Sequence, residues 1–273
     1  IEVAREIFPN IAHIAVFDTS FFHKLPKEVS TYAIDKDVAE KYLIKRYGAH
    51  GTSHEYVGGV AQEIVAQIMS KKGQPAEKIK QIVLHLGNGA SASAQIDNIA
   101  AETSMGITPL EGLVMGTRSG DIDPAVVFLL AREANMSIDE IENFLNKQSG
   151  IKGLSTYSDM RDIRQAAENG DKQSILALKV YIHRLLKYVG SYTAVLGGLD
   201  ILSFTAGVGE NDAQTRAELL DKLKPFGIKY DKAKNLERSK NARIISAPDS
   251  AVQVAVIPTN EELAIAKFAL KLI

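Results

Sequence analysis

The chain has 273 residues, of which 45% are hydrophobic and 24% charged, and its formal net charge is −1. That size and composition favour a soluble globular protein with one or two domains, and the nearly neutral charge argues against nucleic acid as a partner. The chain has no cysteine, which excludes disulfides and thiolate chemistry, and its most apolar long window, residues 189–209, contains glycines and Asp200, so we expect no membrane span.

The first strand that we expect covers residues 12–17 and places Asp18 at its carboxyl end. A carboxylate at such a strand end is a favoured site position in open α/β sheets, although it can equally cap a helix. A helix over residues 37–46 then leads to a glycine-rich turn around His50, and the next helix contains His54. Because glycines flank His50, its backbone can approach a ligand closely, which makes His50 a candidate donor to an anion.

Three short strands are predicted next, over residues 81–86, 91–96 and 99–103, and together they form a meander. The first of them runs into a Gly-Asn-Gly loop at residues 87–89. Such a loop can turn several backbone N–H groups toward a phosphate, although Asn-Gly is also the commonest hairpin turn. The loop is therefore a candidate phosphate-binding site.

Arg118 lies in a glycine-rich loop, residues 115–124, that precedes a helix predicted over residues 125–134. Gly116 allows backbone angles that other residues resist, and Asp123 is expected to cap the helix. A cation on a constrained loop at a helix N-terminus is well placed to recognise an anion. The alternative is an exposed surface ion pair without a function.

The second half of the chain alternates helices and strands. A polar loop over residues 155–162 caps a helix that runs toward Glu168, and a long helix covers residues 172–196. A buried strand over residues 200–205 runs into a Gly-x-Gly loop, residues 206–212, and then a helix over residues 213–223. Strand, glycine loop and helix in this order are typical of phosphate or nucleotide binding, although the third Rossmann glycine and a Walker A motif are both missing.

A last strand over residues 252–257 leads to a final helix over residues 263–272. Thr259 and Glu262 have the spacing of a capping box, which leaves Glu261 free. A free carboxylate at this junction can hold Mg²⁺ through water, or simply place negative charge at the helix N-terminus.

If these strands lie in one sheet, their loops meet at one edge and form a single cleft. That cleft would contain cations, carboxylates and backbone donors, but no obvious covalent nucleophile. Such a set suits direct phosphoryl transfer, in which positioning and electrostatics supply nearly all of the catalysis. The side chains available there are Asp18, His50, Arg118 and Glu261.

Six motifs, in this order and over nearly the whole chain, resemble those of acetate kinases. They are Phe-Asp-Thr at 17–19, Arg-Tyr-Gly-Ala-His-Gly-Thr-Ser-His at 46–54, His-Leu-Gly-Asn-Gly at 85–89, the Arg118 loop at 115–124, Gly-Val-Gly-Glu-Asn at 207–211 and Thr-Asn-Glu-Glu at 259–262. The resemblance implies the α/β actin-like ATPase fold, which is ribonuclease H-like, with a mixed sheet flanked by helices. It further implies Mg²⁺- or Mn²⁺-dependent phosphoryl transfer from ATP to acetate, giving acetyl phosphate and ADP, in a cytoplasmic homodimer.

The resemblance also implies roles for single residues. Arg118 and His50 would stabilise the transferring phosphoryl group, and Asp18 would align or assist at the acetyl phosphate end. Glu261 would take part in binding Mg²⁺. The residues expected to line the ATP site are His85, Leu86, Gly87, Asn88, Gly89, Asp159, Met160, Arg161, Gly207, Val208, Gly209, Glu210 and Asn211.

Two departures from the acetate kinase pattern bear on function. Ala49 stands where many relatives have a phenylalanine that lines the acyl pocket, which keeps propionate open as a substrate. The glycine- and serine-rich strand and loop that open the family's N-terminal lobe are not present. We therefore expect residues 22–262 to form the C-terminal, nucleotide-binding lobe, and residues 1–21 and 263–273 to be parts of the other lobe with exposed apolar faces. By itself the chain would then be inactive, or would act as a nucleotide-binding module without turnover.

Overall fold

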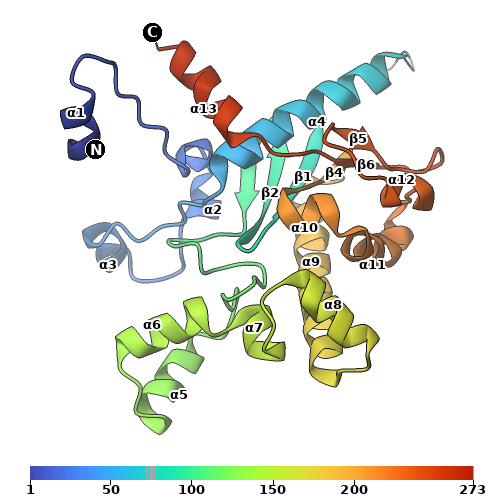
Figure 1. The fold of residues 1–273 in the computed structure, drawn as a ribbon. Helices are drawn as coiled ribbons and strands as arrows, with labels where there is room; N and C mark the ends of the chain where they lie inside the picture. The colour runs from blue at the N-terminus through green and yellow to red at the C-terminus, as the bar shows by residue number, and fades with distance from the viewer. Residues whose placement is uncertain (72, 74–77, 273) are drawn as a thin grey trace.

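The computed structural model describes residues 1–71, 73 and 78–272 of the protein, and Figure 1 shows its fold. The described helices before residue 150 are α1 (Glu2–Ile7), η1 (Ser20–Phe22), α2 (Lys27–Ser30), α3 (Lys36–Lys41), α4 (Gly51–Lys71), α5 (Ala125–Glu133) and α6 (Ile138–Lys147). Those from residue 150 onward are α7 (Gly150–Ser155), α8 (Met160–Glu168), α9 (Lys172–Leu196), α10 (Ala206–Asn211), α11 (Ala213–Leu223), η2 (Lys224–Phe226), α12 (Lys232–Leu236) and α13 (Glu261–Leu270). None of the helices described is long and apolar enough to cross a membrane.

The strands form one mixed sheet, as the resemblance to acetate kinases implies, in the order β3-β2-β1-β4-β6-β5. They are β1 (Lys80–Leu86), β2 (Ala90–Ile96), β3 (Ile99–Thr103), β4 (Ile201–Thr205), β5 (Arg243–Ile244) and β6 (Gln253–Val256). β1, β4 and β6 are parallel, while β2, β3 and β5 pair antiparallel with their neighbours. The carboxyl ends of the three parallel strands therefore meet at one edge, and the loops that follow them lie together, as expected.

Helices cover both faces of this sheet (Figure 1). On β1 the side chain of Val83 packs with α4, whereas Ile82 and Leu84 face the larger core around α9. The alternation follows from the two-residue period of a strand, because β1 is buried on both faces. The central strand β4 is buried over its whole length. A rigid two-sided core thus holds the edge at which the parallel strands end.

The strand expected over residues 12–17 is wrong, because that segment is irregular and largely exposed. An isolated strand leaves its backbone N–H and C=O groups unpaired, and this segment has no neighbouring strand among the described residues. Apolar side chains within residues 1–21, among them Phe8 and Phe17, are exposed. In Figure 1 this segment and α13 both extend from the body at the top of the view.

Two other boundaries also differ from those expected. The loop expected over residues 206–212 is mostly helix α10, because the buried Arg216 guanidinium donates to the C=O groups of Gly209 and Glu210 and so caps its last turn. Helix α3 ends at Lys41 rather than at residue 46, since Leu43 adopts a left-handed backbone conformation. Such a conformation cannot continue a right-handed helix.

The capping box predicted for the last helix is wrong as well. The side-chain oxygen of Asn260 accepts the N–H of Leu263 at 3.0 Å, so Asn260 is the N-cap and α13 begins at Glu261. The hydroxyl of Thr259 instead bonds to the hydroxyl of Ser53 on α4, at 2.8 Å. A tertiary contact has replaced the local cap that the spacing predicts.

Candidate functional site

The side chains of His50 and Arg118 converge on Gly89. A Cβ atom added to Gly89 would lie 3.4 Å from Nε2 of His50 and 3.4 Å from Nη1 of Arg118. His50 comes from the start of α4, Gly89 from the loop after β1, and Arg118 from a loop much further along the chain. The fold therefore brings two of the expected catalytic side chains to one glycine of the expected phosphate loop.

Asp18 fixes the backbone at the start of α4. Its carboxylate accepts the N–H of His50 at 2.6 Å and that of Thr52 at 3.5 Å, and its C=O accepts the N–H of Gly51 at 2.8 Å. His50 itself has a left-handed backbone conformation, with φ of 60°. A carboxylate that binds the first N–H groups of a helix satisfies donors that have no partner within the helix. Asp18 thus acts as a cap, and through that cap it holds His50 in place.

Three imidazoles near Gly89 are shielded from solvent. The rings of His50 and His85 stack with 4.2 Å between their centroids. Burial lowers the pKa of His85 to about 3 and lowers the pKa of the fully buried His54 well below its usual range. Burial also lowers the pKa of His50, and the nearby Asp18 carboxylate only partly offsets that effect. All three rings are therefore neutral at neutral pH, because burial disfavours the charged form.

Among the described residues, only Nη1 of the Arg118 guanidinium has hydrogen-bond acceptors, which are the C=O of Pro109 and Sδ of Met115, while Nε and Nη2 have none. Its Nη1 donates to the C=O of Pro109 at 3.1 Å, and among the described residues it makes no ion pair. The surface ion pair considered as an alternative is therefore not what the structure contains. As expected, Asp123 caps the following helix, since its carboxylate accepts the N–H of Ala125 at 2.8 Å. An arginine without a carboxylate partner on a well-held loop has donors left for an anionic ligand.

Asp18 and Glu261 lie near enough to influence each other. Partial burial raises the pKa of Glu261, and the negative charge of Asp18 raises it further. A divalent cation would relieve the repulsion between two such carboxylates. Within the described part of the chain no three carboxylate or imidazole side chains form a metal cluster. The two carboxylates therefore fit Mg²⁺ only if water or phosphate oxygens supply most of its ligands, which is how this ion is often bound.

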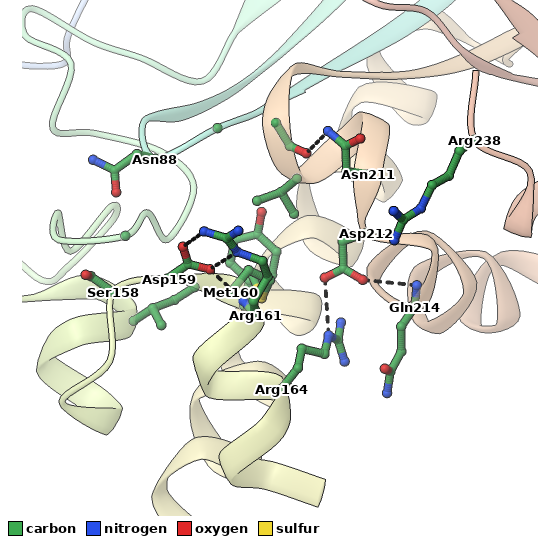
Figure 2. Close-up of a pocket in the computed structure, with 16 residues that line it drawn as sticks. Asn88, Ser158, Asp159, Met160, Arg161, Arg164, Asn211, Asp212, Gln214 and Arg238 are labelled. Atoms are coloured by element: carbon green, nitrogen blue, oxygen red, sulfur yellow. Dashed lines mark hydrogen bonds and ion pairs between the residues drawn. The ribbon is translucent and has the colours of Figure 1, made fainter. Parts of the chain in front are cut away.

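A pocket of about 830 Å³ opens next to the loop that contains Gly89. Figure 2 shows the side chains that line it. The residues of the expected ATP site that line the pocket are Gly87, Asn88, Asp159, Met160, Arg161, Gly207, Val208 and Asn211. His85, Leu86, Gly89, Gly209 and Glu210 do not line it. Leu86 is fully buried in the core, and Gly209 packs against β1 and β4.

Eight further residues line the pocket without having been predicted to do so from the sequence. They are Gly116, Ile151, Ser158, Arg164, Tyr181, Asp212, Gln214 and Arg238. The guanidinium of Arg164 lies between two acids. Its Nε is 3.2 Å from Asp212, as Figure 2 shows, and its Nη1 is 2.6 Å from Glu218. These partners are far apart in the chain, and they come together because α8 and α11 both pack against α9. Asp212 carried a local signal, as a polar residue directly before a helix, and Gly116 lies in the glycine-rich loop that contains Arg118.

Asp159 and Arg161 form an ion pair of 2.6 Å at the rim of the pocket. The carboxylate of Asp159 also accepts the backbone N–H of Arg161 at 2.8 Å and so caps α8. The hydrogen bonds from Arg161 lower the pKa of Asp159 to about 2. Because both side chains are exposed, we expect the pair to shape the pocket rim and to contribute little to stability.

Comparison with known proteins gives one consistent result. The model of the acetokinase family matches residues 1–267. Acetate kinase from Corynebacterium efficiens is 55% identical over 271 residues, and that from Leifsonia xyli is 54% identical, each match covering 99% of this chain and 66% of the relative. The chain thus spans 66% of the length of these curated relatives.

Solved structures agree with these matches. Acetate kinase from Porphyromonas gingivalis superposes with a TM-score of 0.89 at 40% identity, covering 99% of this chain and 66% of that one. A propionate kinase from Francisella tularensis superposes with a TM-score of 0.87 at 42% identity, covering 97% of this chain and 66% of that one. The α/β architecture described above is therefore the one that these kinases share.

Proposed function

This chain belongs to the acetokinase family and has its α/β actin-like ATPase fold, and from that membership we propose that the full-length protein is an acetate kinase. It transfers the γ-phosphoryl group of ATP to a carboxylate oxygen of acetate, reversibly, giving acetyl phosphate and ADP. The observation that carries this proposal is the convergence of His50 and Arg118 on Gly89, beside a pocket of about 830 Å³.

The nucleotide occupies the large pocket in this proposal. A volume of about 830 Å³ lies in the range of sites for cofactor-sized ligands. Gly87 and Asn88 line the end of the pocket next to Gly89, which supports placing the phosphates there and the adenosine toward α8 and α11. The γ-phosphoryl group then comes within reach of Arg118 and His50.

The reaction is a direct displacement. A carboxylate oxygen of acetate attacks the γ-phosphorus while the bond from that phosphorus to the bridging oxygen of ADP breaks. Arg118 stabilises the charge on the transferring oxygens, and the neutral His50 ring donates a hydrogen bond to them. Asp18 positions His50 through the start of α4. In this proposal the side chains stabilise the transferring group or position one another, and none of them forms a covalent intermediate.

Mg²⁺, or Mn²⁺ in its place, is part of the proposal. Glu261 would hold the ion, with Asp18 nearby. The two carboxylates repel each other when no cation is bound, which supports a cation site between them. When bound, such an ion offsets negative charge on the phosphate oxygens. The likeness to acetate kinases further supports a homodimer and a cytoplasmic location, which sedimentation and cell fractionation would test.

The two-lobe organisation also stays a proposal. Residues 22–262 would be the nucleotide-binding lobe, and residues 1–21 and 263–273 would pack against a second lobe. The exposed apolar side chains of residues 1–21 and of the end of α13, such as Leu270, support this arrangement. Because transfer requires two lobes to close on the substrates, we expect the 273-residue chain alone to bind nucleotide without turnover.

Propionate kinase is the second candidate activity. Two observations favour keeping it: Ala49 precedes His50, and the propionate kinase from Francisella tularensis is as similar in fold as the acetate kinase. The test is an acyl phosphate assay with the full-length protein, ATP and Mg²⁺, using acetate, propionate and butyrate in parallel. We expect the highest kcat/KM with acetate. No acyl phosphate from acetate, or a strong preference for butyrate, would contradict the proposal.

A further inference from the structure

A continuous chain of buried hydrogen bonds leads away from His50 into the protein. Nδ1 of His50 lies 2.8 Å from the hydroxyl of Ser91, which lies 2.7 Å from Nε2 of His54. Nδ1 of His54 lies 2.7 Å from the hydroxyl of Ser93, which lies 2.9 Å from Nε2 of Gln95. Ser91, Ser93 and Gln95 share one face of β2 because strand residues alternate, and that face meets α4.

The orientation of Gln95 is fixed by a group that can only accept. Nε2 of Gln95 lies 3.2 Å from the backbone C=O of His54, and its Oε1 lies 2.8 Å from Nε2 of Gln81. Rotating the amide by half a turn would place two oxygens against each other at His54. Gln95 must therefore point its nitrogen toward His54, and it donates its second hydrogen to Ser93.

The hydrogen bond that Gln95 donates to Ser93 fixes the direction of each hydrogen bond from Ser93 to His50. The Ser93 hydroxyl is fully buried and accepts from Gln95, so its single hydrogen has only Nδ1 of His54 to bind among the described residues. Nδ1 of His54 is then an acceptor, and the neutral ring carries its proton on Nε2. That proton goes to Ser91, whose own hydrogen is left for Nδ1 of His50. The opposite direction would leave the buried Ser93 O–H without an acceptor, which proteins avoid.

We propose that Gln95, Ser93, His54 and Ser91 act as positioning residues that hold His50 in one tautomer, with its proton on Nε2. Nε2 is the nitrogen next to Gly89 and Arg118. The chain therefore makes His50 present an N–H donor, rather than a bare acceptor, on the side where Arg118 presents its guanidinium. The value of this donor for phosphoryl transfer rests on the proposed function, but the tautomer itself does not.

Nuclear magnetic resonance of protein labelled with ¹⁵N in its histidines tests the proposal without any substrate. Long-range ¹H–¹⁵N correlations distinguish a protonated ring nitrogen from a bare one, and the His50→Gln variant assigns the signals of His50. We expect Nδ1 of His50 to give the signal of a bare nitrogen and Nε2 that of a protonated one. The opposite pattern, or signals averaged between the two in the unmodified protein, would overturn the proposal.

The variant Ser93→Ala removes a link that does not touch His50, and its matched control is Ser203→Ala. Ser203 is also fully buried in the sheet, but its hydroxyl has no partner among the described residues. We expect Ser93→Ala to shift both His50 ring signals toward averaged positions and Ser203→Ala to leave them unchanged. If the His50 ring signals were the same in the two variants, the proposal that the hydrogen-bond chain sets the tautomer of His50 would be overturned. If Ser93→Ala does not fold, the spectrum of the unmodified protein still decides the tautomer.

Discussion

His50 owes its place to contacts made by other residues. Asp18 binds its backbone N–H, His85 stacks on its ring, and Ser91 binds its Nδ1. Burial keeps the ring neutral, since its pKa is lowered mainly by loss of solvent. At the residue scale the site is therefore a set of groups whose orientation and charge state are fixed before any ligand arrives, which is the arrangement that lowers reorganisation during a reaction.

The buried imidazoles predict a dependence of stability on pH. Burial lowers the pKa of His85 to about 3 and places that of His54 well below its usual range, whereas histidine in an unfolded chain titrates near ~6.5. Between these values the unfolded chain binds more protons than the folded one. Stability is therefore unaffected above about pH 6.5 and falls below it, by up to ~1.4 kcal/mol per pH unit for each ring.

Urea unfolding at a series of pH values measures this slope. His183→Gln serves as the control, because it replaces an exposed histidine on α9 and leaves the two buried rings in place. A free energy of unfolding that stays constant from about pH 6.5 down to about pH 5 would show that the two rings are not buried as neutral groups.

A residue-scale prediction also concerns the acyl pocket. Ala49→Phe would add bulk next to His50 and should favour acetate over propionate, because an extra methylene is worth about 1–3 kcal/mol in a fitted pocket. The measurement is the ratio of kcat/KM for the two acids in the full-length protein. We expect this ratio to rise roughly tenfold or more toward acetate. If the ratio of kcat/KM for the two acids did not change, Ala49 would not line the acyl pocket.

At the element scale, the start of α4 depends on glycine. A Cβ atom on Gly51 would lie 2.2 Å from the C=O of Asp18, which is too close for any real contact. Gly51→Ala should therefore displace the Asp18 cap and cost about 1–3 kcal/mol of stability. The matched control is Gly190→Ala, within helix α9, where a Cβ meets nothing within 4 Å. That variant should be stabilised by about 0.5–1 kcal/mol, as glycine is a poor helix former.

Thermal unfolding of the two glycine variants gives the sign of each effect. If Gly51→Ala were as stable as Gly190→Ala, the close contact between α4 and the Asp18 turn would not exist in solution.

Elements whose signal is local could be predicted from the sequence. β1, β4, α9 and the cap at Asp123 lie where periodicity and capping residues indicate. The expected strand at residues 12–17 failed because a strand requires a partner, which a single sequence does not reveal. Helix α10 was missed because its C-terminal cap, Arg216, comes from the next helix. The wall around Arg164 was missed for the same reason, since its partners Asp212 and Glu218 reach it only through packing.

At the scale of the whole molecule, the fold creates the pocket of about 830 Å³ in which we propose that the nucleotide binds. Gly207 lines it, and a Cβ added there meets no protein atom within 4 Å. Gly207→Leu should therefore fold but fill part of the pocket, and should weaken ADP binding tenfold or more, equivalent to ~1.4 kcal/mol. Gly190→Leu places the same side chain in open space on α9 and serves as the control.

Calorimetric titration of ADP into the 273-residue chain measures this effect. Equal affinities of the Gly207→Leu and Gly190→Leu variants would place the nucleotide elsewhere, and turnover by the unmodified chain would contradict the two-lobe proposal.

The central claim is that Arg118 stabilises a transferring phosphoryl group. The most direct measurement is kcat for acetyl phosphate formation by the full-length protein and its Arg118→Ala variant. The matched control is Arg132→Ala, because Arg132 is exposed on α5 and makes no ion pair among the described residues. We predict that kcat falls by roughly 10²-fold or more for Arg118→Ala and stays within about twofold for Arg132→Ala. A kcat for Arg118→Ala equal to that of the control would contradict the account.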